Sequence, residues 1–188
     1  MGFGEDPHLI AAVRGLIKEY SVQSLVETGT LHGDTTVAMA QWGLPVCTIE
    51  IIEEQFDAVG GLLSRFSNVN QYLGSSPVVL DEILPGLERP ILFFLDAHWY
   101  EYNPLKDELK TIGKHAPNSL VVIHDFEVPG RPELGFDWIN GLHLDYGYIE
   151  EMLPLVYPSG WSYHYNSIAM GMMRGVIFLY PKWKRKIF

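Results

Sequence analysis

The chain of 188 residues contains one cysteine, few basic residues and no long apolar run. The lone cysteine, Cys47, cannot form an internal disulfide, which is typical of a protein in a reducing compartment, so we expect a cytoplasmic location. No run approaches the roughly 18 apolar residues of a membrane span, and the first residues lack the basic-then-apolar order of a signal peptide. The sequence therefore predicts neither a membrane span nor a secretory leader.

Basic residues are outnumbered, because 13 Lys and Arg stand against 23 Asp and Glu and give a formal net charge of −10. Nucleic-acid binding depends on clustered positive charge facing phosphates, so this balance argues against DNA or RNA as a partner. The basic cluster at residues 182–186 is typical of a solubilising tail. We expect a small-molecule partner, and a homo-oligomer remains open.

Apolar and aromatic residues are abundant, at 47% and 13% of the chain. A chain of this length and composition can bury one substantial core but is too short for two ordinary domains. We therefore expect a single domain over residues 1–188. Most of the aromatic side chains are expected in the core, with some lining a ligand pocket.

The most informative segment begins at Ser24, where a short apolar run ends in Glu27 and is followed by Gly29, Gly33 and a helical pattern. This order predicts a strand, a tight turn and the N-terminus of a helix. Glycines allow backbone angles and close ligand approach that a side chain prevents, and the first amides of a helix have no partner within it. The segment therefore predicts a ligand-binding turn.

The spacing of the glycines separates two kinds of ligand. A dinucleotide-binding turn has the pattern G-x-G-x-x-G, whereas this chain has Gly29-x-x-x-Gly33. Glu27 before the turn disfavours a pyrophosphate and favours a cationic amine. Glu50 ends the next predicted strand, where an acid accepts hydrogen bonds from ribose hydroxyls of either an adenosyl or a NAD ligand.

Strand and helix patterns alternate through the first two thirds of the chain. The predicted helices span residues 7–20, 51–66, 76–84 and 104–115, and the predicted strands span 24–27, 45–50, 68–73, 91–95, 119–123, 161–165 and 175–180. Such alternation is typical of an α/β fold with a parallel sheet. The last two strands are separated by only about ten residues, which favours an antiparallel hairpin.

The motif Glu27-x-Gly29-Thr30-x-x-Gly33-x-Thr35 resembles motif I of the class I S-adenosylmethionine (SAM) dependent methyltransferases. Its form is similar to the O-methyltransferase branch that includes catechol-type, macrolide-sugar and cephalosporin-hydroxylase-like enzymes. The resemblance covers about residues 25–180. It implies a Rossmann-like three-layer sandwich whose seven-stranded, mostly parallel sheet has an antiparallel C-terminal strand. The residues it implies for SAM are Glu27, Gly29, Thr30, Gly33, Thr35, Glu50, Ser75, Ser76 and Asp96.

Acids and histidines also follow the fourth and fifth predicted strands, as Asp96 and His98 and as His124, Asp125 and Glu127. Related O-methyltransferases hold Mg²⁺ through acids at these places, so the resemblance implies Asp96 and Asp125 as ligands, with Glu127 as a third. The match is partial, because Phe126 and His98 stand where catechol-type enzymes have an asparagine and a lysine. A magnesium site, a metal-free histidine mechanism and a purely structural role all remain open.

We expect His98 to act as the base that deprotonates the acceptor, with Asp96 beside it and His124 as a competing base. The loop at residues 128–138 is long and aromatic, so it is expected to line the pocket of a small-molecule or glycan-like acceptor, with Trp138 and Arg131 near the substrate. The predicted reaction is O-methylation. The alternatives are an NAD(P)-dependent oxidoreductase and a non-catalytic nucleotide-binding domain.

Overall fold

The computed structural model describes residues 3, 6–97, 102–139 and 141–182. Its helices are α1 (Pro7–Tyr20), α2 (Asp34–Ala40), α3 (Glu53–Leu63), α4 (Ser76–Ile83), α5 (Leu105–His115), α6 (Tyr146–Ile149) and α7 (Leu153–Val156). Its strands are β1 (Ser24–Thr28), β2 (Val46–Glu50), β3 (Val69–Leu73), β4 (Ile91–Leu95), β5 (Leu120–His124), β6 (Trp138–Ile139), β7 (Leu142–His143), β8 (Trp161–Tyr165) and β9 (Val176–Pro181). Short 3₁₀ turns follow α4 and α6, at Leu84–Gly86 and Glu150–Met152.

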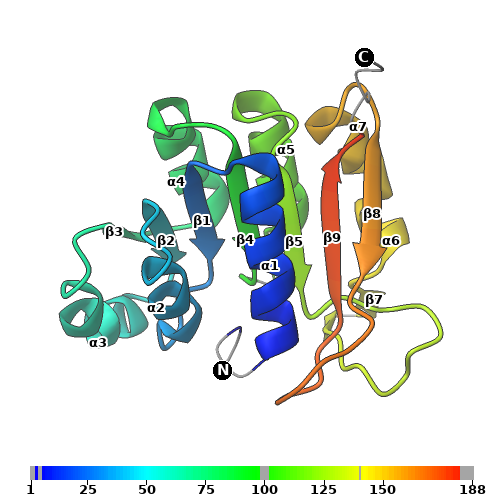
Figure 1. Cartoon of the computed structure of the whole chain (residues 1–188), viewed down its shortest axis with the longest axis horizontal. Helices are drawn as coiled ribbons and strands as arrows, with labels where there is room; N and C mark the ends of the chain where they lie inside the picture. Colours follow the sequence, from blue (N-terminus) through cyan, green and yellow to red (C-terminus); the bar gives the residue numbers. More distant parts are fainter. Residues whose placement is uncertain (1–2, 4–5, 98–101, 140, 183–188) are drawn as a thin grey trace.

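Seven of the strands form one sheet in the order β3-β2-β1-β4-β5-β9-β8. The first five strands in this order are parallel, and β9 is inserted antiparallel between β5 and β8. In Figure 1 the arrowheads of β1 and β5 therefore point to the lower edge of the sheet, whereas that of β9 points to the upper edge. This arrangement confirms the predicted seven-stranded, mostly parallel sheet with an antiparallel C-terminal strand.

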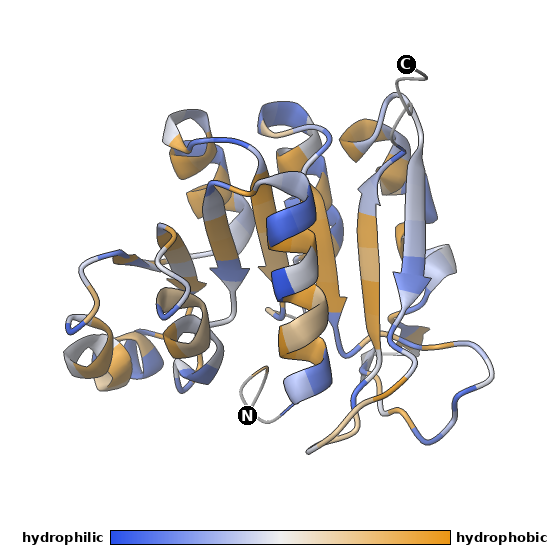
Figure 2. Cartoon of the chain, viewed as in Figure 1, coloured by the Kyte–Doolittle hydropathy of each residue, from blue (hydrophilic) through white to orange (hydrophobic). Residues whose placement is uncertain are grey.

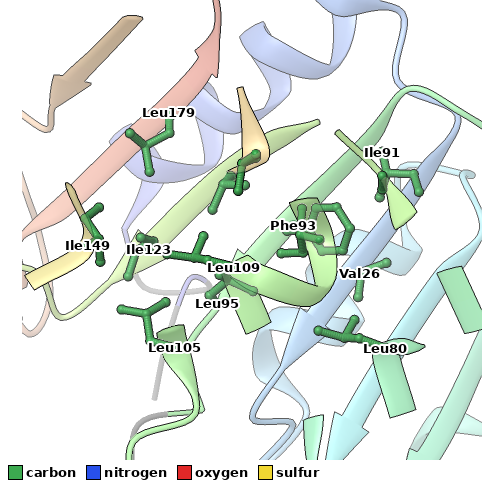
Figure 3. Packing of buried hydrophobic residues seen from close by; sticks show 14 of the residues in the cluster. Val26, Leu80, Ile91, Phe93, Leu95, Leu105, Leu109, Ile123, Ile149 and Leu179 are labelled. Atoms are coloured by element: carbon green, nitrogen blue, oxygen red, sulfur yellow. The ribbon is translucent and has the colours of Figure 1, made fainter. Parts of the chain in front are cut away.

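Helices cover both faces of the sheet, which makes the fold a three-layer sandwich. Successive residues of a strand face opposite sides, so Phe93 packs toward α4 and α5 while Phe94 packs toward α1. Figure 3 shows the first of these layers, with Leu80 and Leu109 against Val26 and Phe93. Figure 2 shows that the central strands are almost continuously apolar, as expected for strands buried on both faces.

The strand order reverses at β1, because the chain passes to β2 on one side and later to β4 on the other. Loops that leave neighbouring strands in opposite directions open a crevice beyond their carboxyl ends, where ligands of such sheets bind. The ends of β1, β2, β4 and β5 all meet at this edge. Among the described residues, none of the helices has the length and apolarity needed to cross a bilayer.

The helix predicted over residues 51–66 is shorter in the structure, as α3. Its start is delayed because the Glu50 carboxylate accepts hydrogen bonds from the backbone N–H groups of Ile51 and Ile52. Residues 138–156 also hold elements that the pattern did not predict, namely the β6–β7 hairpin, α6 and α7. Each of these strands and helices spans only two to four residues, too short for a periodic pattern to develop.

Candidate functional site

A cavity of about 360 Å³ opens at the carboxyl ends of β1, β2 and β4, at the reversal of the strand order. It is bounded by residues at the end of β2 and in the segments that follow β1 to β5: Gly29, Leu31, Ile49, Glu50, Ile51, Ile52, Gln55, Gly74, Ser75, Ser76, Asp96, Ala97, Tyr102, Pro104 and Asp125. This volume is in the range of pockets for small ligands and cofactors. The cavity is the candidate binding site of the molecule.

The glycine turn after β1 approaches the end of β4 very closely. Gly29 has a φ of 84°, and a Cβ placed on it would lie 2.5 Å from the carbonyl oxygen of Asp96. The contact is fixed on both sides, because the Gly29 N–H donates to the Ile49 carbonyl at 2.9 Å and the Asp96 N–H donates to the Thr28 carbonyl at 3.1 Å. Only glycine meets both the conformational and the steric requirement here.

Glu27 lies beneath this turn with 1% of its surface exposed. Its Oε2 accepts hydrogen bonds from the hydroxyls of Thr36 on α2 and Thr48 on β2, the second at 2.7 Å. Thr48 also shares a hydrogen bond of 2.6 Å with Thr30 in the turn. Burial raises the pKa of Glu27 to about 8, although the two threonine hydroxyls act in the opposite direction. The carboxyl group thus joins the turn, α2 and β2, and it is not among the residues that line the cavity.

Glu50 reaches the cavity from the end of β2, and three backbone amides fix its carboxylate. Oε1 accepts from Ile51 and Ile52, and Oε2 accepts from Leu31 of the turn, all at 2.9 Å. An ionised carboxylate has about four acceptor sites, so this arrangement leaves capacity for a further donor from a ligand. Glu50 is therefore a charged acceptor held in one orientation at the cavity wall.

The opposite wall is formed by the start of α4 and the segment before α5. Ser75 is the residue before the first turn of α4, and the adjacent Ser76 donates to the buried carboxylate of Glu108 on α5. Tyr102 donates its hydroxyl hydrogen to Asp107. These contacts hold the two elements around the cavity, and both serines predicted for the cofactor are at its surface.

The acids after β4 and β5 converge as the sequence predicts. Ligand atoms of Asp96, His124 and Asp125 all lie within 4.8 Å of one another, and His124 Nδ1 is 3.2 Å from a carboxylate oxygen of each aspartate. Burial lowers the pKa of His124, but the charges of Asp96 and Asp125 and their hydrogen bonds outweigh it and raise the pKa to about 10. His124 is therefore an imidazolium at neutral pH.

Arg174, in the turn between β8 and β9, reaches the same cluster. Its Nε donates to Oδ1 of Asp125, and its Nη2 donates to Oδ1 of Asp137. Asp137 is itself fixed next to the cluster, since its N–H donates to the Asp125 carbonyl at 2.8 Å. The guanidinium group thus bridges two carboxylates that belong to the loop after β5.

This arrangement fits a divalent cation poorly. Asp125 already accepts from Arg174, and His124 Nδ1 already lies 3.2 Å from a carboxylate oxygen of both Asp96 and Asp125, so these groups have partners within the chain. Glu127 accepts instead from His143 Nδ1 at 3.0 Å and is not one of the three converging groups. Two of the three magnesium ligands expected from the resemblance, Asp96 and Asp125, thus lie together, but cations of the chain itself compensate their charge.

The predicted site residues fall into two groups. Those at the cavity are Gly29, Glu50, Ser75, Ser76, Asp96 and Asp125, whereas Glu27, Thr30, Gly33, Thr35, His124 and Glu127 are not part of its lining. His98 lies outside the described residues. Trp138 is 69% exposed, and Arg131 donates to Glu133 and to the Ser167 carbonyl, so neither reaches the cavity.

Sequence reasoning missed Tyr102, Arg174 and Asp137. One signal could have pointed to Arg174. It is the only Lys or Arg between residues 161 and 181, and it lies in the turn of a predicted hairpin. Tyr102 and Asp137 lie in segments without periodicity, so their place in the site depends on the tertiary structure.

No protein-family model and no curated protein matches this sequence. Solved structures do resemble the fold. An O-methyltransferase from Bacillus cereus in complex with SAH (S-adenosylhomocysteine) is 18% identical over 97% of this chain and 84% of that chain, with a TM-score of 0.65. The O-methyltransferase TomG from Streptomyces achromogenes, in complex with SAM, is 15% identical over 91% and 78%, with a TM-score of 0.64.

A mutant form of the protein MtNAS, in complex with SAM, is also similar, at 13% identity over 92% of this chain and 61% of that chain and a TM-score of 0.54. At such identities these likenesses establish the fold alone, a Rossmann-like fold that this chain shares with the two O-methyltransferases and MtNAS. One fold can carry many activities, so the reaction follows from the chemistry of the site.

Proposed function

We propose that this protein is a SAM-dependent methyltransferase that methylates a hydroxyl group of a small-molecule or glycan-like acceptor. The observation that carries the proposal is the cavity of about 360 Å³ at the strand reversal, where Gly29 forms the floor and Glu50 is held by three amides. The fold, and the complexes of B. cereus O-methyltransferase and TomG with SAH and SAM, support the same cofactor.

Each part of SAM has a matching surface in the cavity. The ribose hydroxyls donate to Glu50, and the adenine contacts Ile51, which lines the cavity and is 61% exposed. The adenine edge faces Ser75 and Ser76. The methionine part passes over Gly29, where the carboxylate of Asp96 attracts its cationic amine.

Methyl transfer requires the acceptor oxygen in line with the sulfonium methyl group, and the acceptor hydroxyl loses its proton as the new bond forms. His124 is charged at neutral pH and does not take this proton. We retain His98 as the base, with Asp96 orienting the acceptor. The proposed reaction does not use magnesium, because the residues after β4 and β5 fit a divalent ion poorly.

The acceptor approaches from the side of the loop after β5. Trp138, at 69% exposure, forms an edge-on contact with His143, which also lies against Phe136. Exposed aromatic rings suit the apolar faces of a phenol or a sugar ring. The net charge of −10 supports a small acceptor rather than a nucleic acid, and the single cysteine supports a cytoplasmic location.

The Glu50→Ala variant tests the cofactor site. Loss of this charged acceptor is expected to weaken SAH binding by about 1–3 kcal/mol, roughly 5–150-fold in affinity, because the ribose hydroxyls lose their partner. The matched control is Glu54→Ala, which removes the same charge from an exposed position outside the cavity and should leave the affinity unchanged. Calorimetry with SAH measures both variants.

The reaction is followed in parallel by the release of SAH from SAM in the presence of phenolic and sugar acceptors. The Glu50→Ala variant should raise the KM for SAM by the same factor as it weakens SAH. If this variant instead binds SAH as tightly as the wild-type protein, the ribose contact is wrong and the cofactor is placed differently.

A further inference from the structure

We propose that Arg174 is a built-in cation of the acidic cluster beyond β4 and β5, where it excludes a divalent metal ion and holds Asp125 and Asp137 in place. Asp96 and Asp125 lie together in this cluster with His124, and Arg174 connects Asp137 to Asp125. Arg174 bridges the last two with separate nitrogens of one planar group. The contacts of Arg174 with the two aspartates hold whatever reaction the protein catalyses. Only an effect of Arg174 on methyl transfer rests on the proposed function.

The backbone around Arg174 is fixed on both sides. The Gly135 N–H donates to the Met173 carbonyl at 2.7 Å, and the Gly175 N–H donates to the Gly135 carbonyl at 2.8 Å. Asn166 Nδ2 donates to the Arg174 carbonyl at 2.9 Å. Figure 1 shows the segment between β8 and β9 beside the loop that follows β5, at the lower edge of the sheet, where β1 and β5 end.

The sequence also leaves room for the guanidinium group. A Cβ on Gly135 would lie 2.9 Å from Nη1 of Arg174, so a side chain at that position would displace the arginine. The Arg174 side chain is 22% exposed, and those of Asp125 and Asp137 are 14% and 28% exposed. A charge-assisted contact at this degree of burial is screened less than a surface ion pair. Arg174 is thus built into the site.

Charge balance explains why a metal is excluded. Mg²⁺ binds through one or two carboxylates that have no other cation, whereas here Arg174 neutralises the pair formed by Asp125 and Asp137. A divalent ion at Asp125 would have to break its bond to Arg174 and would meet the positive charge of the guanidinium at close range. Arg174 is a positioning residue, because it acts through the carboxylates of Asp125 and Asp137.

Binding of Mn²⁺, followed by the loss of the free-ion electron paramagnetic resonance signal, tests this proposal without any need for activity. The wild-type protein and Arg174→Lys are expected to show no stoichiometric binding at millimolar Mn²⁺, since each keeps a cation between Asp125 and Asp137, which Arg174→Met lacks. Arg174→Met is expected to bind one Mn²⁺ per chain, with an affinity at least about tenfold above that of the wild type. Arg65→Met, at an exposed arginine beyond α3, is the matched control and should behave as wild type.

Thermal unfolding gives a second readout on the same proteins. MgCl₂ should raise the melting temperature of Arg174→Met by about 2–4 °C over NaCl of equal ionic strength, and it should leave the wild type unchanged. Stoichiometric Mn²⁺ binding by the wild-type protein would overturn the proposal, and that measurement needs no variant to fold. A folded Arg174→Met that gains no Mn²⁺ site would overturn it as well. SAH calorimetry on the wild type separates these outcomes from a failure of the proposed function.

Discussion

Replacing Gly29 with alanine is expected to abolish SAH binding and to lower the free energy of unfolding by about 3 kcal/mol or more. Gly29 has a φ of 84°, a conformation that costs a residue with a Cβ about 1–2 kcal/mol. The added Cβ would also lie 2.5 Å from the carbonyl oxygen of Asp96 and 3.2 Å from the Cα of Ala97. These are backbone atoms, so the ends of β1 and β4 must separate, and the cavity between them changes shape.

Gly43→Ala is the matched control for this experiment. Gly43 has nearly the same φ, 78°, but a Cβ built on it meets no atom within 4 Å. It should therefore show only the conformational cost, about 1–2 kcal/mol in chemical denaturation, and bind SAH like the wild type. If Gly29→Ala binds SAH as Gly43→Ala does, the close approach of β1 and β4 does not shape the cofactor site.

Glu27→Ala is expected to weaken SAH binding by at least about tenfold, whereas Glu27→Gln should remain within about threefold of the wild type. The alanine leaves the hydroxyls of Thr36 and Thr48 without their common acceptor and loosens α2 from β2. The glutamine carbonyl keeps that acceptor. Calorimetry with SAH on both variants decides between this role and the amine contact inferred from the sequence, because loss of binding in Glu27→Gln would show that the negative charge touches the cofactor.

The wild-type protein and Glu27→Gln should differ in the pH dependence of the free energy of unfolding. Burial raises the pKa of Glu27 from an ordinary value of 4.5 to about 8, so the folded state holds this proton more tightly than the unfolded state. The resulting stabilisation is complete below about pH 4.5 and is lost as the pH rises through 8. Between about pH 4.5 and pH 8 the free energy of unfolding, measured with urea, should therefore fall less in Glu27→Gln than in the wild-type protein.

The fold could be predicted because its signals are local. The run Ile91–Leu95 is apolar throughout and becomes the central strand β4, and the glycines at 29 and 33 mark the turn after β1. The places of Glu50 and Asp96 followed from topology, since the carboxyl ends of parallel strands share one edge. These residues could be placed at the site without knowing which side chains they contact.

The pairing of side chains could not be predicted from the same signals. Arg174 meets Asp125 across 49 positions of the chain and Asp137 across 37, through a turn and a loop without periodicity. Glu27 has the residue type and position expected for a cofactor contact, yet it is buried between Thr36 and Thr48. Whether a strand-end carboxylate faces a ligand, a hydroxyl or a guanidinium depends on the packing of elements far apart in the sequence.

The cofactor is the central claim, and isothermal titration of the full chain with SAH, SAM and NAD tests it most directly. We expect SAH and SAM to bind one per chain with a Kd in the micromolar range, about −8 kcal/mol, and NAD to bind at least about 100-fold more weakly. The Glu50 carboxylate serves either ribose, but the turn from Gly29 to Gly33 lacks the glycine spacing that accommodates a pyrophosphate. NAD binding as tightly as SAH, or no binding of either SAH or SAM, would contradict the account.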